Sequence, residues 1–456
     1  MTHRLAPVTI GDTRLALGPI GGETAAEIAE SIRALIDRGA LAPGDILPPV
    51  RSLGEQLGVN RNTVVAAYRL LNQAGAVETR GRGGTRVAIR AAVPLEGYAP
   101  DSVLRDVANG NPDPALIPDL SPALATLAGR PVLYGEPTID PSLERWAHAW
   151  ITRDLGTRDD LRLTVTGGAV DALERLFADA LARDDLVGLE DPCFLSALRT
   201  VRVGGYRPHA IPVDDEGMTV DGLRAALAAG VRAIVCTPRA HNPTGASLTS
   251  ERAAALRGVL AEHPHVLVIE DDHFSLLSRR PYVSIIGPGH RRWALIRSVS
   301  KFLGPDLCLA VTASDAETAA RLAERLSPGS TWVSHLLQRL VVALVADDEV
   351  MAAVERAAEH YRERNAAFAE HARAVGLPCH AGDGLSLWLS LPAPARAVTE
   401  QLMRRGWLAR PGDDFLLAGE AALRHLRLTV HDLSDEDAAR LAADIAAAVD
   451  TVLRTT

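Results

Sequence analysis

The sequence predicts an α/β protein with a mostly parallel sheet, preceded by a small winged helix-turn-helix domain. From about Asn109 onward, short apolar runs alternate with helical patterns, which is typical of a parallel sheet covered by helices. The first ninety residues instead contain short helical patterns followed by two strand-like runs joined by glycines. At 456 residues, the chain is long enough for about two to four domains.

The first expected helix spans about residues 24–37. Ile28, Ile32 and Leu35 recur at helical spacing and form one apolar stripe, and Gly39 follows the last of them. This helix should therefore bury one face in a small core.

Two shorter helices are expected next, joined by a tight turn at Gly58. The first, up to Leu57, opens after a proline pair, and Asn60 is placed to cap the second, at 61–71. Two short helices joined through a glycine have the geometry of a DNA-binding helix-turn-helix, whose second helix presents its polar first turn to base edges. The residues of that helix expected to face the core are Val64, Tyr68 and Leu71.

A basic hairpin should follow, with strands at 77–80 and 85–89 joined by the glycine-rich residues 81–84. Its arginines can reach a phosphate or a narrow minor groove. A helical protein-docking module would be the alternative, but it needs no basic wing of this kind. Residues 47–51 (Leu-Pro-Pro-Val-Arg), 58–64 (Gly-Val-Asn-Arg-Asn-Thr-Val) and 82–85 (Arg-Gly-Gly-Thr) resemble the winged helix-turn-helix of the GntR family. The DNA contacts that this resemblance implies are Arg51, Arg61, Asn62, Thr63, Arg80 and Arg82.

Pro94, Gly97 and Pro100 interrupt a stretch without periodic apolar residues, which indicates a linker. The expected organisation is a head at 1–89, a linker at 90–105 and a large domain at 106–456, of which about 345–456 forms a small α+β subdomain.

Charge is divided unevenly between these parts. Residues 1–90 hold 11 arginines against 8 acids, whereas the rest holds 37 basic and 49 acidic side chains. Only the head is therefore expected to meet a polyanion. The chain has no apolar run of transmembrane length and no secretory signal at its start, so we expect a cytoplasmic protein that does not meet a membrane. The four cysteines lack the spacing of zinc ligands or of a disulfide framework.

Lys301 is the only lysine among 48 basic residues. Arginine stays protonated, whereas a desolvated lysine can lose its proton and condense with an aldehyde. The apolar run 293–297 before it reads as a buried strand, so Lys301 should lie just past the carboxyl end of a strand, where open α/β sheets bind ligands. Chance survival of one lysine in an arginine-rich chain is the alternative, and the other motifs must decide between the two.

Four further stretches have the character of a site. Residues 164–173 read as a strand, a glycine turn and a helix start, which can hold a phosphate on backbone amides. Phe194 follows a strand and can stack on a planar ligand or simply fill the core. Residues 234–245 form a strand followed by an Asn-Pro-Thr-Gly turn, and residues 265–274 form a strand that ends in three acids. A metal site at those acids would need more ligands than the sequence places there.

The order of these motifs, closed by Ser298-Val299-Ser300-Lys301, resembles the fold type I pyridoxal-phosphate enzymes of the aspartate aminotransferase superfamily over about residues 105–456. The resemblance implies pyridoxal 5'-phosphate as cofactor, held by a Schiff base (internal aldimine) to Lys301. Asp271 would keep the pyridine nitrogen protonated, Asn242 would donate to the phenolate oxygen, and Phe194 would stack on the ring. The phosphate would be held by Ser298, Ser300 and the turn at Gly168, Ala169 and Val170.

Two further landmarks follow from the same resemblance. Arg427, in His-Leu-Arg-Leu, would clamp the carboxylate of an amino-acid-like substrate or effector. Tyr134, in Tyr-Gly-Glu-Pro, would reach the phosphate of a partner subunit, which implies a homodimer. A GntR head on an aminotransferase-like body is the architecture of the MocR-type regulators.

The chain departs from the wider pattern at two positions. His273 replaces the usual tyrosine after the acids, and its ring can bond nearby groups but titrates near neutral pH. Cys308 stands where an arginine usually grips the cofactor phosphate. Losing that contact costs about 1.5–3 kcal/mol, so we expect weakened, reversible cofactor binding.

Three functions agree with the sequence. The first is a regulator that binds an operator in double-stranded DNA, senses pyridoxal phosphate and controls vitamin B6 genes, with no enzyme activity beyond residual half-reactions. The second is a working aminotransferase with a DNA-binding appendage, which Arg427 keeps open. The third is a body that serves only to dimerise, for which Cys308 is the main argument.

Overall fold

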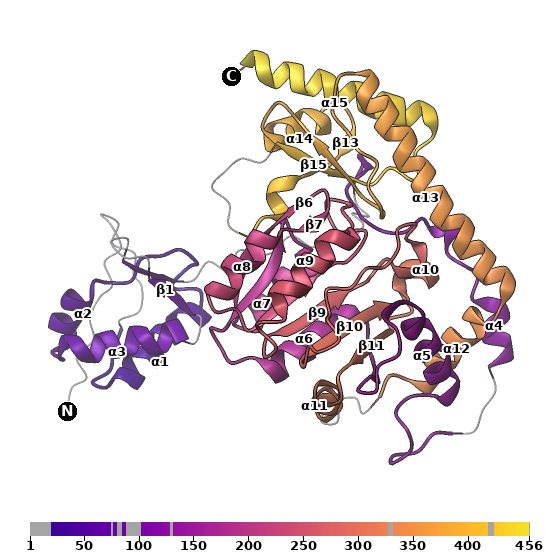
Figure 1. Ribbon diagram of the computed structural model, residues 1–456. Coiled ribbons are helices and arrows are strands. Elements are labelled where there is room, and N and C mark those ends of the chain that lie inside the picture. Colours follow the sequence, from indigo (N-terminus) through magenta and orange to yellow (C-terminus); the bar gives the residue numbers. More distant parts are fainter. Residues whose placement is uncertain are drawn as a thin grey trace. The chain divides into compact units, whose positions relative to one another are not determined.

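The computed structural model describes residues 20–73, 76–79, 84–87, 102–127, 131–326, 332–417 and 424–455 (Figure 1). The chain divides into two compact units, Met1–Ala92 and Val93–Thr456. Each unit is described by itself. Within the described residues, no helix combines the length and apolar character needed to cross a membrane.

The first unit holds three helices around one small core. Helix α1 (Ala25–Asp37) begins at Thr24, which forms a capping box with Glu27, and it buries Ile28, Ile32 and Leu35 as expected. Helix α2 (Val50–Leu57) ends at Gly58, whose φ of +69° permits the sharp turn.

Helix α3 (Arg61–Gln73) follows the turn and completes the helix-turn-helix. The Asn60 side chain accepts a hydrogen bond from the Asn62 amide at 2.9 Å, so the expected cap is present. Val64, Tyr68 and Leu71 are buried, and the Tyr68 hydroxyl donates to the Pro48 carbonyl oxygen at 2.6 Å. That bond joins α3 to the chain just before α2.

The two strands of the wing pair antiparallel, β1 (Val77–Thr79) with β2 (Thr85–Val87). Val77 and Val87 add to the core of the head. Arg80 and Arg82 lie outside the described residues.

The second unit contains an eight-stranded sheet in the order β4-β11-β10-β9-β8-β5-β6-β7. The five strands from β10 to β6 are parallel, whereas β11 and β7 run antiparallel to their neighbours. The strands are β4 (Arg162–Thr166), β5 (Leu186–Asp191), β6 (Arg207–Asp214), β7 (Gly217–Met218), β8 (Ala233–Cys236), β9 (Leu267–Asp271), β10 (Trp293–Ser298) and β11 (Ala310–Ser314).

Helices cover both faces of this sheet, which explains why its central strands are apolar on both sides. One face packs on α6 and α7, and the other on α8 and α9. The helices of the large part are α4 (Ser121–Thr126), α5 (Pro141–Leu155), α6 (Ala169–Ala180), α7 (Leu195–Val203), α8 (Val220–Ala228), α9 (Ser250–Leu260), α10 (Ser300–Leu303), α11 (Ala316–Leu326) and α12 (His335–Val345).

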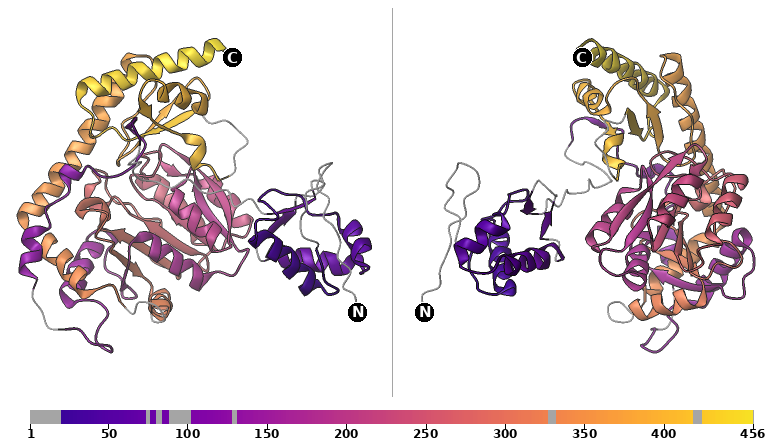
Figure 2. Two further views of the ribbon diagram at one scale, coloured as in Figure 1. Left: turned by 180° about the vertical axis from the view of Figure 1, so that it is seen from behind. Right: turned by 60° about the vertical axis from the view of Figure 1, so that its left-hand side comes forward.

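The small subdomain begins with the long helix α13 (Asp348–Ala374), which lies beside α15 (Asp435–Thr455) in both views (Figure 1, Figure 2). These helices pack with α14 (Ala395–Met403) on a three-stranded sheet of β12 (Leu387–Ser390), β15 (His425–Leu428) and β14 (Arg410–Pro411). The chain that enters from the linker joins this subdomain, because β3 (Arg105–Asp106) pairs with β13 (Trp407–Leu408).

Candidate functional site

The functional side chains expected from the sequence gather at the carboxyl ends of the parallel strands. Asp271 is the last residue of β9, and Lys301 is the second residue of α10, directly after β10. Lys301 lines a small cavity together with Asn242 and His273. The structure therefore brings three of the expected cofactor residues to one place, where an open α/β sheet binds its ligands.

The Lys301 amine is held by the backbone of a distant segment. Its Nζ donates a hydrogen bond to the Gly110 carbonyl oxygen at 3.1 Å. Gly110 belongs to the chain that follows β3, 191 residues earlier in the sequence.

Asp271 is buried and carries an oxygen suited to a cationic ligand group. Only 4% of the residue is exposed, and its Oδ1 has no hydrogen-bond partner among the described residues. Burial, and then the charge of neighbouring Asp272, raises the pKa of Asp271 to about 7, although the Lys301 charge acts to lower it. A buried carboxylate oxygen without a partner fits a protonated pyridine nitrogen.

Phe194 and His273 form two parallel walls. Their ring planes differ by 5°, and their centroids are 6.5 Å apart. Burial first, and then the Lys301 charge, lowers the pKa of His273 to about 4, so the imidazole is neutral at pH 7. This neutral wall suits the face of an aromatic cofactor.

The turn that carries Asn242 is supported by His241 and Glu190. His241 Nδ1 lies 2.8 Å from Thr244 Oγ1, and its Nε2 lies 3.4 Å from Glu190 Oε2. Glu190 Oε2 also accepts the Thr237 amide at 2.9 Å, and burial raises the pKa of Glu190 to about 8. The sequence motifs do not indicate this support, and the only signal for it is the position of Glu190 at a strand end.

Asp272 lies in a second buried cluster that sequence reasoning did not find. It accepts bonds from Arg239 and from Arg297, each at 2.8 Å, and all three side chains are nearly or fully buried. Although burial acts to raise it, the hydrogen bond from Arg239 holds the pKa of Asp272 below its ordinary value. The two adjacent aspartates therefore differ in acidity, and Asp272 is the stronger acid.

The expected phosphate residues lie at two helix starts. Gly168, with φ +103°, precedes α6, and Val170 in its first turn is 40% exposed. At α10, the Ser300 amide donates to Ser298 Oγ at 3.1 Å. Cys308 is exposed, and its thiol donates to the Pro305 carbonyl oxygen at 3.3 Å.

Arg427 is fully buried beneath the chain that follows β3. Its Nη2 donates to the Ala108 carbonyl oxygen, its guanidinium lies 5.1 Å above the Phe415 ring, and a Cβ atom on Gly110 would come within 2.8 Å of its Nη1. A carboxylate can reach Arg427 only if this chain moves. Tyr134 is 88% exposed and packs its ring against Trp332.

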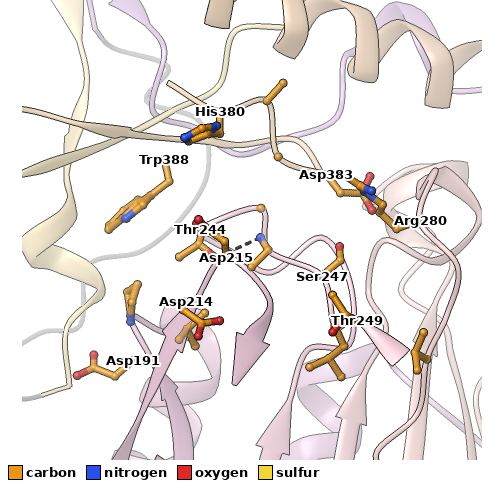
Figure 3. Close-up of a pocket in the computed structure, with 18 of the residues that line it drawn as sticks. Asp191, Asp214, Asp215, Thr244, Ser247, Thr249, Arg280, His380, Asp383 and Trp388 are labelled. Carbon is orange, nitrogen blue, oxygen red and sulfur yellow. Dashed lines mark hydrogen bonds between the residues drawn. The ribbon is translucent and has the colours of Figure 1, made fainter. Parts of the chain in front are cut away.

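A larger cleft of about 840 Å³ lies beside the Asn242 turn. In Figure 3, His380 and Trp388 of the small subdomain face Thr244 and Asp215 across it. Asp383 lines both this cleft and the cavity at Lys301. The small subdomain therefore covers the carboxyl end of the sheet.

In the head, the first turn of α3 presents polar groups outward. Arg61 and Asn62 are exposed, and Thr63 is partly exposed. Arg51 on α2 is also exposed and pairs with Glu55 at 3.3 Å. These four residues are available to a nucleic-acid ligand.

Comparison with known proteins agrees with this division into two parts. Residues 24–87 match the bacterial regulatory proteins of the gntR family. Residues 104–445 match aminotransferase class I and II.

Two curated relatives extend over most of the chain. The vitamin B6 salvage pathway transcriptional repressor PtsJ of Salmonella typhimurium is 46% identical over 93% of this chain and 98% of its own. The pyridoxine biosynthesis transcriptional regulator PdxR of Corynebacterium glutamicum is 29% identical over 74% of this chain and 76% of its own. Among solved structures, a kynurenine aminotransferase of Pyrococcus horikoshii matches with a TM-score of 0.70 and 20% identity, covering 77% of this chain and 92% of that one. That likeness shows the fold of the body.

Proposed function

The chain belongs to the GntR-family regulators that carry an aminotransferase class I and II domain, and from this premise we propose that it senses pyridoxal 5'-phosphate through Lys301. In this proposal the head binds an operator in double-stranded DNA, and occupancy of the body changes that binding. The observation that carries the proposal is the single lysine of the chain, which lies near the buried Asp271 and lines a cavity with Asn242 and His273.

Each residue of the site has a distinct task. Asp271 holds a proton on the pyridine nitrogen, Asn242 donates to the phenolate oxygen, and Phe194 and His273 contact the two ring faces. The phosphate contacts come from Ser298, Ser300, Gly168, Ala169 and Val170. When bound, pyridoxal phosphate supplies an aldehyde that a lysine amine captures and a ring that withdraws electrons.

Control of vitamin B6 genes is the biological role that the relatives support. PtsJ is named as a repressor of the vitamin B6 salvage pathway, and PdxR as a regulator of pyridoxine biosynthesis. A regulator of these pathways that binds their product would adjust transcription to the supply of the cofactor.

A homodimer is part of the same proposal. Tyr134 and Leu133 are largely exposed, as are Leu124 and Leu336, and a partner subunit would cover such apolar side chains. A dimer carries two heads and can bind two half-sites on DNA.

The test is an absorbance titration of the full-length protein with pyridoxal phosphate, followed by borohydride reduction and peptide mapping. Lys301 offers the only side-chain amine, so the α-amino terminus is the internal control. We expect the reduced adduct on the Lys301 peptide. A protein that takes up no label there, at saturating cofactor, contradicts the proposal.

A working aminotransferase is the second candidate, and Arg427 beside the cavity is the observation in its favour. Multiple turnovers of an amino acid with a keto acid would establish it. The covered position of Arg427 favours slow half-reactions instead, because each substrate must first displace the chain at Ala108 and Gly110.

A further inference from the structure

The segment that leads from the linker into the body is bonded closely to the small subdomain. We call residues 106–113 the strap. Its Val107 amide donates to the Leu408 carbonyl oxygen at 2.9 Å, and its Gly110 amide donates to Thr429 Oγ1 at 3.1 Å. The carbonyl oxygens of Val107 and Asn111 accept bonds from the Thr429 amide and from His431 Nε2. The strap and the small subdomain should therefore move together.

Lys301 contacts the strap from the other side. Its Nζ bonds Gly110 O at 3.1 Å and comes from α10, which follows a central strand of the large sheet. Thr429 and Lys301 thus hold the two sides of the same residue, since one accepts the Gly110 amide and the other donates to its carbonyl. The Lys301 bond ties the large sheet to the strap.

We propose that the Lys301–Gly110 bond couples the position of the strap to whether Lys301 carries the cofactor. The proposal rests on the proposed function, since it names the route from the cofactor site toward the linker. Without cofactor, the Lys301 amine fixes the strap to the sheet. With cofactor, the strap is released and moves with the small subdomain.

The chemistry of capture accounts for the release. For capture, the Lys301 ammonium group would first release one proton to solvent. The neutral amine would then attack the aldehyde carbon, a carbon–nitrogen double bond would form, and the carbonyl oxygen would leave as water with the two remaining amine hydrogens. The nitrogen then keeps at most one hydrogen, fixed in the plane of the double bond, in place of the three rotatable ones of the ammonium group that can reach Gly110 O. A hydrogen bond from a charged amine is among the stronger ones, so its loss shifts the strap equilibrium by about tenfold or more.

The strap is well placed to transmit this change, because the chain reaches the head through the residues just before it. Residues 90–105 were expected to form the linker, and β3 at Arg105–Asp106 begins the part fixed to the subdomain. A displacement of the strap therefore moves the point at which the linker is attached to the body. Coupling of this kind needs an element with two arrangements that ligand binding biases, and the strap is that element.

Hydrogen exchange on the full-length protein tests the release directly. Amides of Val107, Ala108, Gly110, Asn111 and Asp113 all donate hydrogen bonds, so a peptide covering them reports the strap. These amides bond to the small subdomain or within the strap, so they exchange when the strap opens locally. Losing the Lys301 bond makes that opening easier, and we therefore expect exchange there to become about tenfold faster with pyridoxal phosphate. Lys301→Met without cofactor should show the same faster exchange, because it lacks the donor. If Lys301→Met exchanges at the same rate as the cofactor-free wild type, the proposal is overturned.

Thr429→Val tests the transmission without touching the captured amine. It removes the acceptor of the Gly110 amide and keeps the side-chain shape, so the strap should follow the subdomain less closely at Gly110, although its backbone bonds at Val107 remain. The ratio of operator affinities with and without cofactor should fall toward one, while borohydride still labels Lys301. Thr399→Val is the matched control, since this buried threonine of the same subdomain bonds only its own helix at Arg396 O among the described contacts.

The two measurements separate the two ideas. If Lys301 is labelled and cofactor shifts operator affinity, but neither variant changes strap exchange or the ratio, the strap is not the route and the proposed function stands. If Lys301→Met frees the strap but the wild type takes up no label, the Lys301–Gly110 bond is real and the proposed function fails. A Thr429→Val protein that keeps the wild-type ratio overturns the role of the strap in transmission.

Discussion

Around Lys301, the ionisable side chains are buried close together, so the charge of each depends on the others. Asp271 and Glu190 both have pKa values raised by burial, to about 7 and about 8, whereas Asp272 stays ionised beside two arginines. Of the two aspartates at this strand end, Asp271 has a buried oxygen, Oδ1, without a hydrogen-bond partner among the described residues, whereas both oxygens of Asp272 accept bonds from arginine. The site is therefore prepared for one positive group, the ring nitrogen.

The residue at position 308 tests the phosphate end of the site. Cys308→Arg should tighten the binding of pyridoxal phosphate about tenfold to a hundredfold, because a guanidinium adds a charge-assisted bond to the phosphate. The dissociation constant from an absorbance titration measures this. Cys308→Ser adds no charge and should leave the constant unchanged. Equal constants for the arginine variant and the wild type contradict the assignment of this position to the phosphate.

Glu190 should make the stability of the cofactor-free protein depend on pH. Its pKa is raised by burial to about 8 in the folded state, against about 4.3 in an unfolded chain. Between these values the folded state binds the extra proton, so the free energy of unfolding falls as pH rises from about 4 to 8. Glu190→Gln has no carboxyl group at this position, so its free energy of unfolding should not fall with pH for this reason.

The measurement is the melting temperature of both proteins at pH 5 and pH 8. The melting temperature of Glu190→Gln minus that of the wild type should be larger at pH 8 than at pH 5. The exposed Glu262→Gln is the control and should show no such change. A difference that stays constant with pH for Glu190→Gln contradicts the burial argument.

The chemical residues of the site were largely predictable, but their supporting groups were not. Lys301, Asp271 and Asn242 follow apolar strands in recognisable motifs, and parallel strands bring their carboxyl ends together. The contact of His241 with Glu190 and the pairing of Asp272 with Arg239 and Arg297 join residues from different strands and turns. Such pairings depend on register and sheet order, which local patterns do not contain.

At the scale of elements, α3 is the part of the head expected to read DNA. Asn62 lies exposed in its first turn, where a recognition helix contacts base edges. Asn62→Ala should weaken operator binding by about 1–3 kcal/mol if the amide reads a base. Asn72→Ala changes the same side chain at the other, exposed end of the helix and should have little effect. Operator titrations of both variants measure this. Equal losses of operator affinity would contradict the claim that the first turn of α3, and not its last, contacts the bases.

The elements themselves followed the sequence closely where apolar periodicity was strong. Helix α1 was expected at 24–37 and spans Ala25–Asp37, and α3 was expected at 61–71 and spans Arg61–Gln73. The pairing of β3 with β13 was not foreseen, because it joins residues some three hundred positions apart. The antiparallel direction of β11 and β7 likewise follows from chain connections and not from composition.

For the whole molecule, the account joins one chemical site to one DNA-binding head through the chain between them. The charge division predicts that the head, and not the acidic body, meets a polyanion. A ligand can change operator affinity only by binding the two conformations of the regulator with different affinity. Coupling of about 1–3 kcal/mol, or roughly fivefold to 150-fold in affinity, is typical of such proteins.

The affinity of the full-length protein for its operator, with and without pyridoxal phosphate, tests the central claim most directly. An operator selected from random DNA serves as the probe, at constant salt, and Lys301→Ala is measured beside the wild type. The account predicts a shift of at least about fivefold in the wild type and none in Lys301→Ala. Equal affinities with and without cofactor in a wild-type protein that carries the label on Lys301 would contradict it.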